Sequence, residues 1–123
     1  MCSSKSKLGL SAEILASSYL AEIGYKIIDS NYHSRYGEID IIANENENLV
    51  FVEVRCRRTN TYGSPIESIT NKKKNNIILT AQDYIEKKQL YDMPCRFDVV
   101  EVTSNEGKLS IKEVVKDAFT LDC

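Results

Sequence analysis

The sequence predicts an α/β domain with elements in the order α-β-β-β-α-β-β and a mixed β-sheet flanked by helices. Apolar residues recur at helical spacing near the N-terminus and again in the middle of the chain. Segments of alternating polarity lie between these two regions and after the second. Short turns make the first three strands an antiparallel meander, and a right-handed helical crossover then returns the chain in parallel. The 123 residues are enough for one domain, residues 1–123, with its core at about 8–115.

The first helix is predicted from an apolar stripe near the N-terminus. Apolar residues recur at spacings of three and four from Leu8 to Ile23, and Gly24 then provides a stop. A short strand over residues 25–32 and a turn over 34–37 follow.

The next two strands form the most informative part of the chain. Gly37-Glu38-Ile39-Asp40-Ile41-Ile42-Ala43 and Leu49-Val50-Phe51-Val52-Glu53-Val54-Arg55-Cys56-Arg57 read as a β-hairpin. Side chains on one side of a strand recur at every second position. If the chain turns symmetrically around Asn46 and Glu47, Asp40 faces Glu53 and Glu38 faces Arg55.

The second helix is predicted to start at a capping-box signature, Ser64-Pro65-Ile66-Glu67, and to end near Lys88. Pro94 then breaks the chain. Two further strands are expected at 96–103 and 108–115, joined by a turn at Asn105-Glu106-Gly107.

The opposed acids of the hairpin indicate a metal site. Directly opposed residues have Cβ atoms roughly 5 Å apart, and two carboxylates held that close repel unless a cation or a proton lies between them. Oxygen ligands of this kind suit an ion such as Mg²⁺. The alternative for Asp40 and Glu53 is two solvated acids at strand ends. For Glu38 and Arg55 it is a cross-strand ion pair without catalytic meaning.

Basic residues gather in one stretch, although the net charge is only −2. Between residues 55 and 74 the only acid is Glu67. Such a stretch favours either a surface that contacts a nucleic-acid backbone or a solvated face. Lys73 lies on the apolar stripe of the second helix, where it can contact phosphate or extend to solvent. The residues assigned to the backbone-contact surface are Arg57, Arg58, Lys72 and Lys74.

The cysteines argue against a zinc site or a disulfide scaffold. Cys2, Cys56, Cys95 and Cys123 include no C-x-x-C pair, and the chain has one histidine. We expect reduced thiols. Because no apolar run approaches the roughly 20 residues that span a bilayer and the start lacks an apolar signal core, we expect a cytoplasmic protein.

The ordered set of motifs resembles a known family. Gly37-Glu38-Ile39-Asp40, then Phe51-Val52-Glu53-Val54-Arg55 and Arg57-Arg58, resemble the P-D-(D/E)-x-K nuclease core. More narrowly, they resemble the uncharacterised bacterial YraN-type endonuclease-like proteins, which are related to archaeal Holliday-junction resolvases. The resemblance spans roughly residues 9–115. It includes Glu13, Asn31-Tyr32, Tyr62-Gly63, Lys73 and Arg96-Phe97-Asp98-Val99-Val100.

This resemblance implies a restriction-endonuclease-like fold and a site for Mg²⁺ or Mn²⁺. The implied ligands are Asp40, Glu53, the Val54 carbonyl and Glu13, the last directly or through water. The spacing of Glu13 alone favours the alternative of an exposed helix acid. Arg55 occupies the position where the family more often has lysine. Because arginine stays protonated, it can offset charge, as can Lys73, but it is a poor base.

The implied activity is hydrolysis of DNA phosphodiester bonds, in branched or junction DNA, and a homodimer would suit a symmetric junction. The alternative is a nucleic-acid-binding or protein-interaction domain that keeps the nuclease fold without its chemistry. Asp98 is interpreted as structural. Tyr62 is interpreted as a loop residue that covers the core, with stacking on a base as the alternative.

Overall fold

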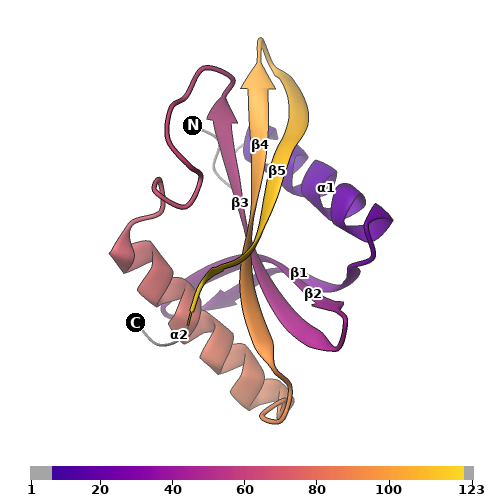
Figure 1. The fold of residues 1–123 in the computed structure, drawn as a ribbon. Coiled ribbons are helices and arrows are strands. Elements are labelled where there is room, and N and C mark those ends of the chain that lie inside the picture. The colour runs from indigo at the N-terminus through magenta and orange to yellow at the C-terminus, as the bar shows by residue number, and fades with distance from the viewer. Residues whose placement is uncertain (1–6, 121–123) are drawn as a thin grey trace.

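The computed structural model describes residues 7–120, which form one five-stranded sheet and two helices (Figure 1). The strands lie in the order β1-β2-β3-β4-β5; β3 and β4 are parallel and all other neighbours are antiparallel. This arrangement confirms the predicted fold class and the helical crossover. The elements are α1 (Lys7–Glu22), β1 (Lys26–Ser34), β2 (Gly37–Glu45), β3 (Asn48–Arg58), α2 (Asn71–Lys88), β4 (Cys95–Asn105) and β5 (Lys108–Phe119).

The helices cover opposite faces of the sheet. On one face, α2 packs Ile77, Ala81 and Tyr84 into a cluster that includes Phe51 and Phe97. On the other face, α1 contributes the buried residues Ala12, Ala16 and Leu20 to a second cluster with strand residues such as Val50 and Val100. The central strands β3 and β4 are therefore buried on both sides, as their nearly continuous apolar sequences require.

The β2–β3 turn fixes which side chains share a face. Asn46 and Glu47 have φ angles of 49° and 68°, the left-handed pair that a tight hairpin turn requires. The register runs from Glu45 opposite Asn48 to Ile41 opposite Val52. The predicted turn centre is thus confirmed, and the pairing extrapolates to Asp40 opposite Glu53.

The second helix starts later than predicted, at Asn71 rather than Ser64. Ser64 does form the expected bond, because its Oγ accepts from the Glu67 N–H at 3.2 Å. That bond closes only a local turn. Thr70 is the true N-cap, and its Oγ1 accepts from the Lys73 N–H at 3.1 Å. The predicted end at Lys88 is confirmed, since Gln89 follows in the left-handed conformation.

Replacing the Thr70 cap tests this helix start. Thr70→Ala is expected to lower the free energy of unfolding by about 1 kcal/mol, because one helical N–H loses its acceptor. Ser64→Ala should have a smaller effect, since Ser64 is exposed and caps no continuing helix. Urea-unfolding midpoints measure both. A larger loss for Ser64→Ala than for Thr70→Ala would contradict the assigned start.

Three smaller expectations have mixed outcomes. Asp98 is structural as predicted: it is fully buried and accepts from the Tyr25 hydroxyl at 2.7 Å and from Arg96 Nε at 2.9 Å. Tyr62 does not cover the core, because it is 95% exposed. Cys56 is disulfide-bonded, so the expectation of reduced thiols is wrong there; Cys95 is free.

Over residues 7–120, neither helix has the length and apolar character needed to cross a bilayer.

Candidate metal centre

The site lies where β2 and β3 part. Their backbone pairing ends at Ile41 and Val52, whereas β3 stays paired with β4 as far as Arg58 and Ser104. In Figure 1 the far halves of β3, β4 and β5 extend away from β1 and β2. Beyond the last pair, the Val54 N–H donates to Asp40 Oδ2 at 2.8 Å. A side chain therefore replaces the neighbouring strand, and the sheet opens into a fork.

Four carboxylates meet in this fork. Glu13 from α1 and Glu38 and Asp40 from β2 each place an oxygen within 4.8 Å of the others. Glu53 from β3 is close enough to Asp40 for its charge to raise the Asp40 pKa. Glu13, Asp40 and Glu53 are 6%, 6% and 5% exposed. Such acids can stay together only with a proton or a cation among them.

Burial is the main cause of the shifted pKa values in the fork. It raises the pKa of Asp40 well above its usual range, and the Glu53 charge adds to this effect while the Val54 N–H opposes it. Burial also raises the Glu53 pKa, against the pull of Lys73. The Glu13 pKa rises to about 7, through burial first and the charge of Glu38 second. Without a cation, the cluster therefore holds protons near neutral pH.

The oxygens of this cluster fit a hard divalent cation. Among the residues that the structure describes, Glu13 Oε1 and Glu53 Oε1 are buried and have no hydrogen-bond partner, which is costly unless another ligand satisfies them. The Val54 N–H faces the fork, and the carbonyl of a strand residue points to the same side as its N–H. Carboxylate and carbonyl oxygens are the ligands that Mg²⁺ and Mn²⁺ prefer.

Two positively charged side chains, Arg55 and Lys73, lie beside the cluster, next to the second carboxylate oxygen of Glu53, Oε2. Arg55 Nη1 is 3.7 Å and Lys73 Nζ is 3.8 Å from Glu53 Oε2. Arg55 is held by Ser68, whose Oγ accepts from Arg55 Nε at 3.3 Å. The turn that precedes α2 thus positions Arg55, and the first turn of α2 supplies Lys73.

Glu38 has a closer role in the cluster than the sequence interpretation gave it. The sequence predicts Glu38 as a partner for Arg55, whereas the structure shows an ion pair with His33 Nε2 at 3.2 Å. Glu38 belongs to the acidic cluster because one of its carboxylate oxygens lies within 4.8 Å of carboxylate oxygens of Glu13 and Asp40. The available signal was its position two residues before Asp40 on one strand.

The residues assigned to a backbone-contact surface divide into two groups. Arg58 and Lys72 are exposed and Lys74 is half-buried. Arg57 points inward instead: it is 5% exposed, and its Nε donates to Glu101 Oε2 at 2.5 Å and its Nη2 to the Gly63 carbonyl at 2.8 Å. Arg57 therefore holds the loop that follows β3.

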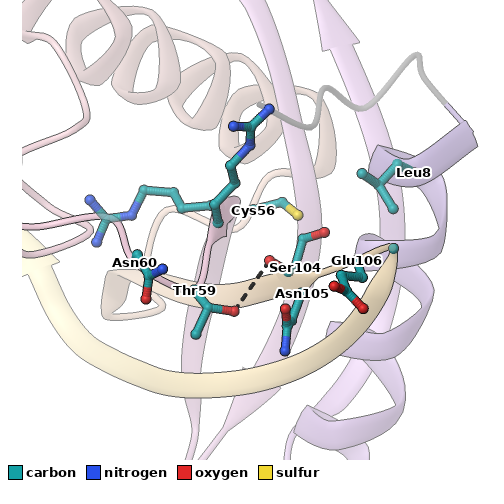
Figure 2. A pocket seen from close by; sticks show the side chains of 10 residues that line it. Leu8, Cys56, Thr59, Asn60, Ser104, Asn105 and Glu106 are labelled. Atoms are coloured by element: carbon teal, nitrogen blue, oxygen red, sulfur yellow. Dashed lines mark hydrogen bonds between the residues drawn. The ribbon is translucent and has the colours of Figure 1, made fainter.

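That loop borders a pocket of about 670 Å³ (Figure 2). Its lining includes Thr59, whose Oγ1 donates to the Ser104 carbonyl at 3.3 Å. The bond joins the end of β3 to the end of β4, so this pocket lies at the far tip of the sheet and not in the fork.

The raised pKa values predict a pH-dependent stability. A carboxyl with a higher pKa in the folded state binds more protons there, so its stabilisation is complete below the unfolded pKa and is lost as pH rises through the folded pKa. For Glu13 this range runs from 4.5 to about 7, and Asp40 and Glu53 shift in the same direction. The free energy of unfolding should fall by about 1–2 kcal/mol between pH 5 and 7.5.

Urea unfolding at the two pH values measures this loss. Glu13→Gln should flatten the profile, and Mn²⁺ at pH 7.5 should restore stability by binding the folded state. The lowered pKa of Glu45, caused mainly by its hydrogen bond with Lys116, acts only at lower pH. Stability that rises from pH 5 to 7.5 would contradict the prediction.

The fold and the fork together define a class: a small mixed α/β domain built around a buried carboxylate cluster suited to a hard cation. The chain belongs to the uncharacterised protein family UPF0102, whose model matches residues 12–102. This membership confirms the family that the motifs predicted.

Relatives match over nearly their whole length. A UPF0102 protein from Syntrophomonas wolfei subsp. wolfei is 39% identical over 109 residues, covering 89% of this chain and 95% of the relative. One from Hahella chejuensis is 46% identical over 115 residues, covering 92% and 90%. A crystal structure of a repair endonuclease from Pyrococcus abyssi matches with a TM-score of 0.41 at 18% identity, covering 87% of this chain and 42% of that chain. A likeness of that size establishes no shared activity.

Proposed function

We propose that the protein is a metal-dependent endonuclease that hydrolyses DNA phosphodiester bonds. The observation that carries the proposal is the fork: buried carboxylates with unpartnered oxygens lie directly beside Arg55 and Lys73. Mg²⁺ or Mn²⁺ would be held by Glu13, Asp40, Glu53 and the Val54 carbonyl. When bound, the cation would acidify the attacking water and offset negative charge on the phosphate.

The chain's own residues supply orientation and positive charge. Arg55 is fixed by Ser68 and stays protonated, so it can stabilise the extra negative charge of the transition state but cannot accept a proton. Lys73, whose side chain is 43% exposed, can approach the same phosphate from the start of α2. Arg55 and Lys73 each pair with Glu53 in the absence of substrate, so their positive charges are already in place before a phosphate binds.

The substrate contacts extend from the fork along the basic residues. Arg58, Lys72 and Lys74 come from the same two elements as Arg55 and Lys73, so a DNA backbone passing the fork would meet them in turn. We include branched and junction DNA among the substrates, a homodimer as the form that acts on a symmetric junction, and the cytoplasm as the place of action.

Arg55 favours a second candidate function, the binding of nucleic acid without cleavage. Arg55 occupies the position of the commoner lysine, and a domain that binds nucleic acid without cleaving it would tolerate that change. Binding of this kind would weaken steeply with salt, since counterions are released from the phosphates. A protein-interaction domain would show no such dependence.

Cleavage assays separate these functions. Labelled duplex, four-way junction, flapped and single-stranded DNA are incubated with the protein in Mg²⁺, in Mn²⁺ and in a chelator, with Asp40→Asn as the control for contaminating nuclease. Cleavage that needs the cation and is absent in Asp40→Asn supports the proposal. Cleavage by neither protein, with salt-sensitive binding, would replace it with the binding function.

A further inference from the structure

A small pocket adjoins the candidate metal centre, and neither Arg55 nor Lys73 lines it. It has a volume of about 270 Å³ and lies between α1 and β1. Glu13 and Asp40 form part of its wall, so it is continuous with the carboxylate cluster. Its other lining residues are apolar or uncharged: Leu10, Ile14, Ser17, Ser18, Ser30 and Asn31.

The two sides of the cluster differ in charge. Arg55 and Lys73 approach Glu53 from β3 and α2. The described residues that line the pocket include no lysine, arginine or histidine. A phosphate placed in the pocket would face Glu13 and Asp40 without a neutralising side chain, which is unfavourable. The pocket therefore suits an uncharged group attached to a phosphate that lies over the cluster.

The lining matches the chemistry of a nucleobase. Leu10 and Ile14 remain 49% and 61% exposed, although large apolar side chains on a surface helix are normally turned to the core. They offer an apolar wall to the flat face of a base. The serine hydroxyls can each donate and accept a hydrogen bond, so they can pair with the edge of any base. That edge is available only when the base is unpaired.

We infer that this pocket receives one unpaired nucleobase beside the phosphate held over the carboxylate cluster. The inference rests on the proposed function and deepens it: the substrate is nucleic acid with an unpaired nucleotide at the point of cleavage. Because hydroxyls suit every base, discrimination among the four bases is small. The backbone follows the basic side of the fork while the base enters from the α1 side.

The test compares three oligonucleotide duplexes of one sequence. The first is fully paired, the second has one unpaired thymidine, and the third has an abasic analogue at the same position, which keeps the backbone but lacks the base. Binding is measured by fluorescence anisotropy and cleavage in Mn²⁺ by gel. We expect the unpaired thymidine to improve binding about tenfold over the other two, the scale of one stacked base.

A matched pair of variants locates the effect. Ile14→Ser removes the more exposed of the two apolar residues in the pocket wall and should abolish most of the thymidine preference. Ile23→Ser replaces an isoleucine that is 42% exposed and lies outside the pocket lining, so it should keep the preference. Both positions are exposed, so both variants should fold, and circular dichroism is the check.

The outcomes separate this inference from the proposed function. Base-dependent binding that Ile14→Ser removes, without cleavage by the wild type, supports the pocket and overturns the nuclease. Cleavage with equal binding of thymidine and abasic duplexes supports the nuclease and overturns the pocket. A preference that survives Ile14→Ser also overturns the pocket, and failure to bind any duplex overturns both.

Discussion

Asp40→Asn is expected to abolish cation binding while making the cation-free protein more stable. Asp40 is buried beside three other acids, and removing one charge relieves their repulsion. Asparagine keeps an oxygen that can accept from the Val54 N–H, so the fork should keep its shape. Mn²⁺ affinity should fall by more than about 100-fold, since residues that merely support ligands already contribute about 10–100-fold.

Calorimetric titration with Mn²⁺ and urea unfolding in a chelator measure the two effects. Asp92→Asn is the matched control, because Asp92 is exposed in the turn before β4 and should alter neither. Unchanged Mn²⁺ affinity in Asp40→Asn would remove the metal assignment. A loss of stability in the chelator would show that the acids are not in repulsion.

Arg55→Ala is expected to lower kcat by about 100-fold or more, the scale of removing one preorganised transition-state contact. Mn²⁺ binding should persist, since the carboxylates remain. Arg55→Lys should keep or raise activity in the physiological pH range, because lysine also carries positive charge and is the commoner residue at this position. Single-turnover cleavage and Mn²⁺ titration measure the two variants.

Arg58→Ala provides the contrast for Arg55, because it is an exposed arginine on the same strand. Because Arg58 is a proposed phosphate contact, Arg58→Ala should weaken DNA binding and reduce the salt slope by about 1 while leaving kcat close to the wild-type value.

The outcomes for Arg55 decide whether the protein is a nuclease. If the wild type cleaves nothing and Arg55→Lys restores cleavage, Arg55 has switched the chemistry off. If neither cleaves any DNA or RNA, the nuclease function is wrong.

The fork explains how a small sheet makes room for a polar site. Ending the β2–β3 pairing at Ile41 and Val52 while β3 continues with β4 creates a buried gap. Asp40 satisfies the Val54 N–H across that gap, so the sheet parts there without leaving that donor unpaired.

Local patterns were sufficient for the type and order of the elements, the β2–β3 turn and the opposition of Asp40 and Glu53. Side chains along a strand alternate between the two faces of the sheet, and a two-residue turn allows only one register between its strands. The pairing of the two strands can therefore be predicted from residues that are close in the sequence. The family could also be predicted, because its motifs occur in order along most of the chain.

Contacts between distant residues decided the rest. Only the packing of α1 on the sheet brings Glu13 to Glu38 and Asp40, and only the loop after β3 turns Arg57 inward to Glu101. The capping-box sequence at Ser64 satisfied its local bond, yet the helix begins at Asn71. Local hydrogen bonds and periodicity can be read from neighbouring residues, whereas burial and charge partners depend on segments that meet only when the chain is folded.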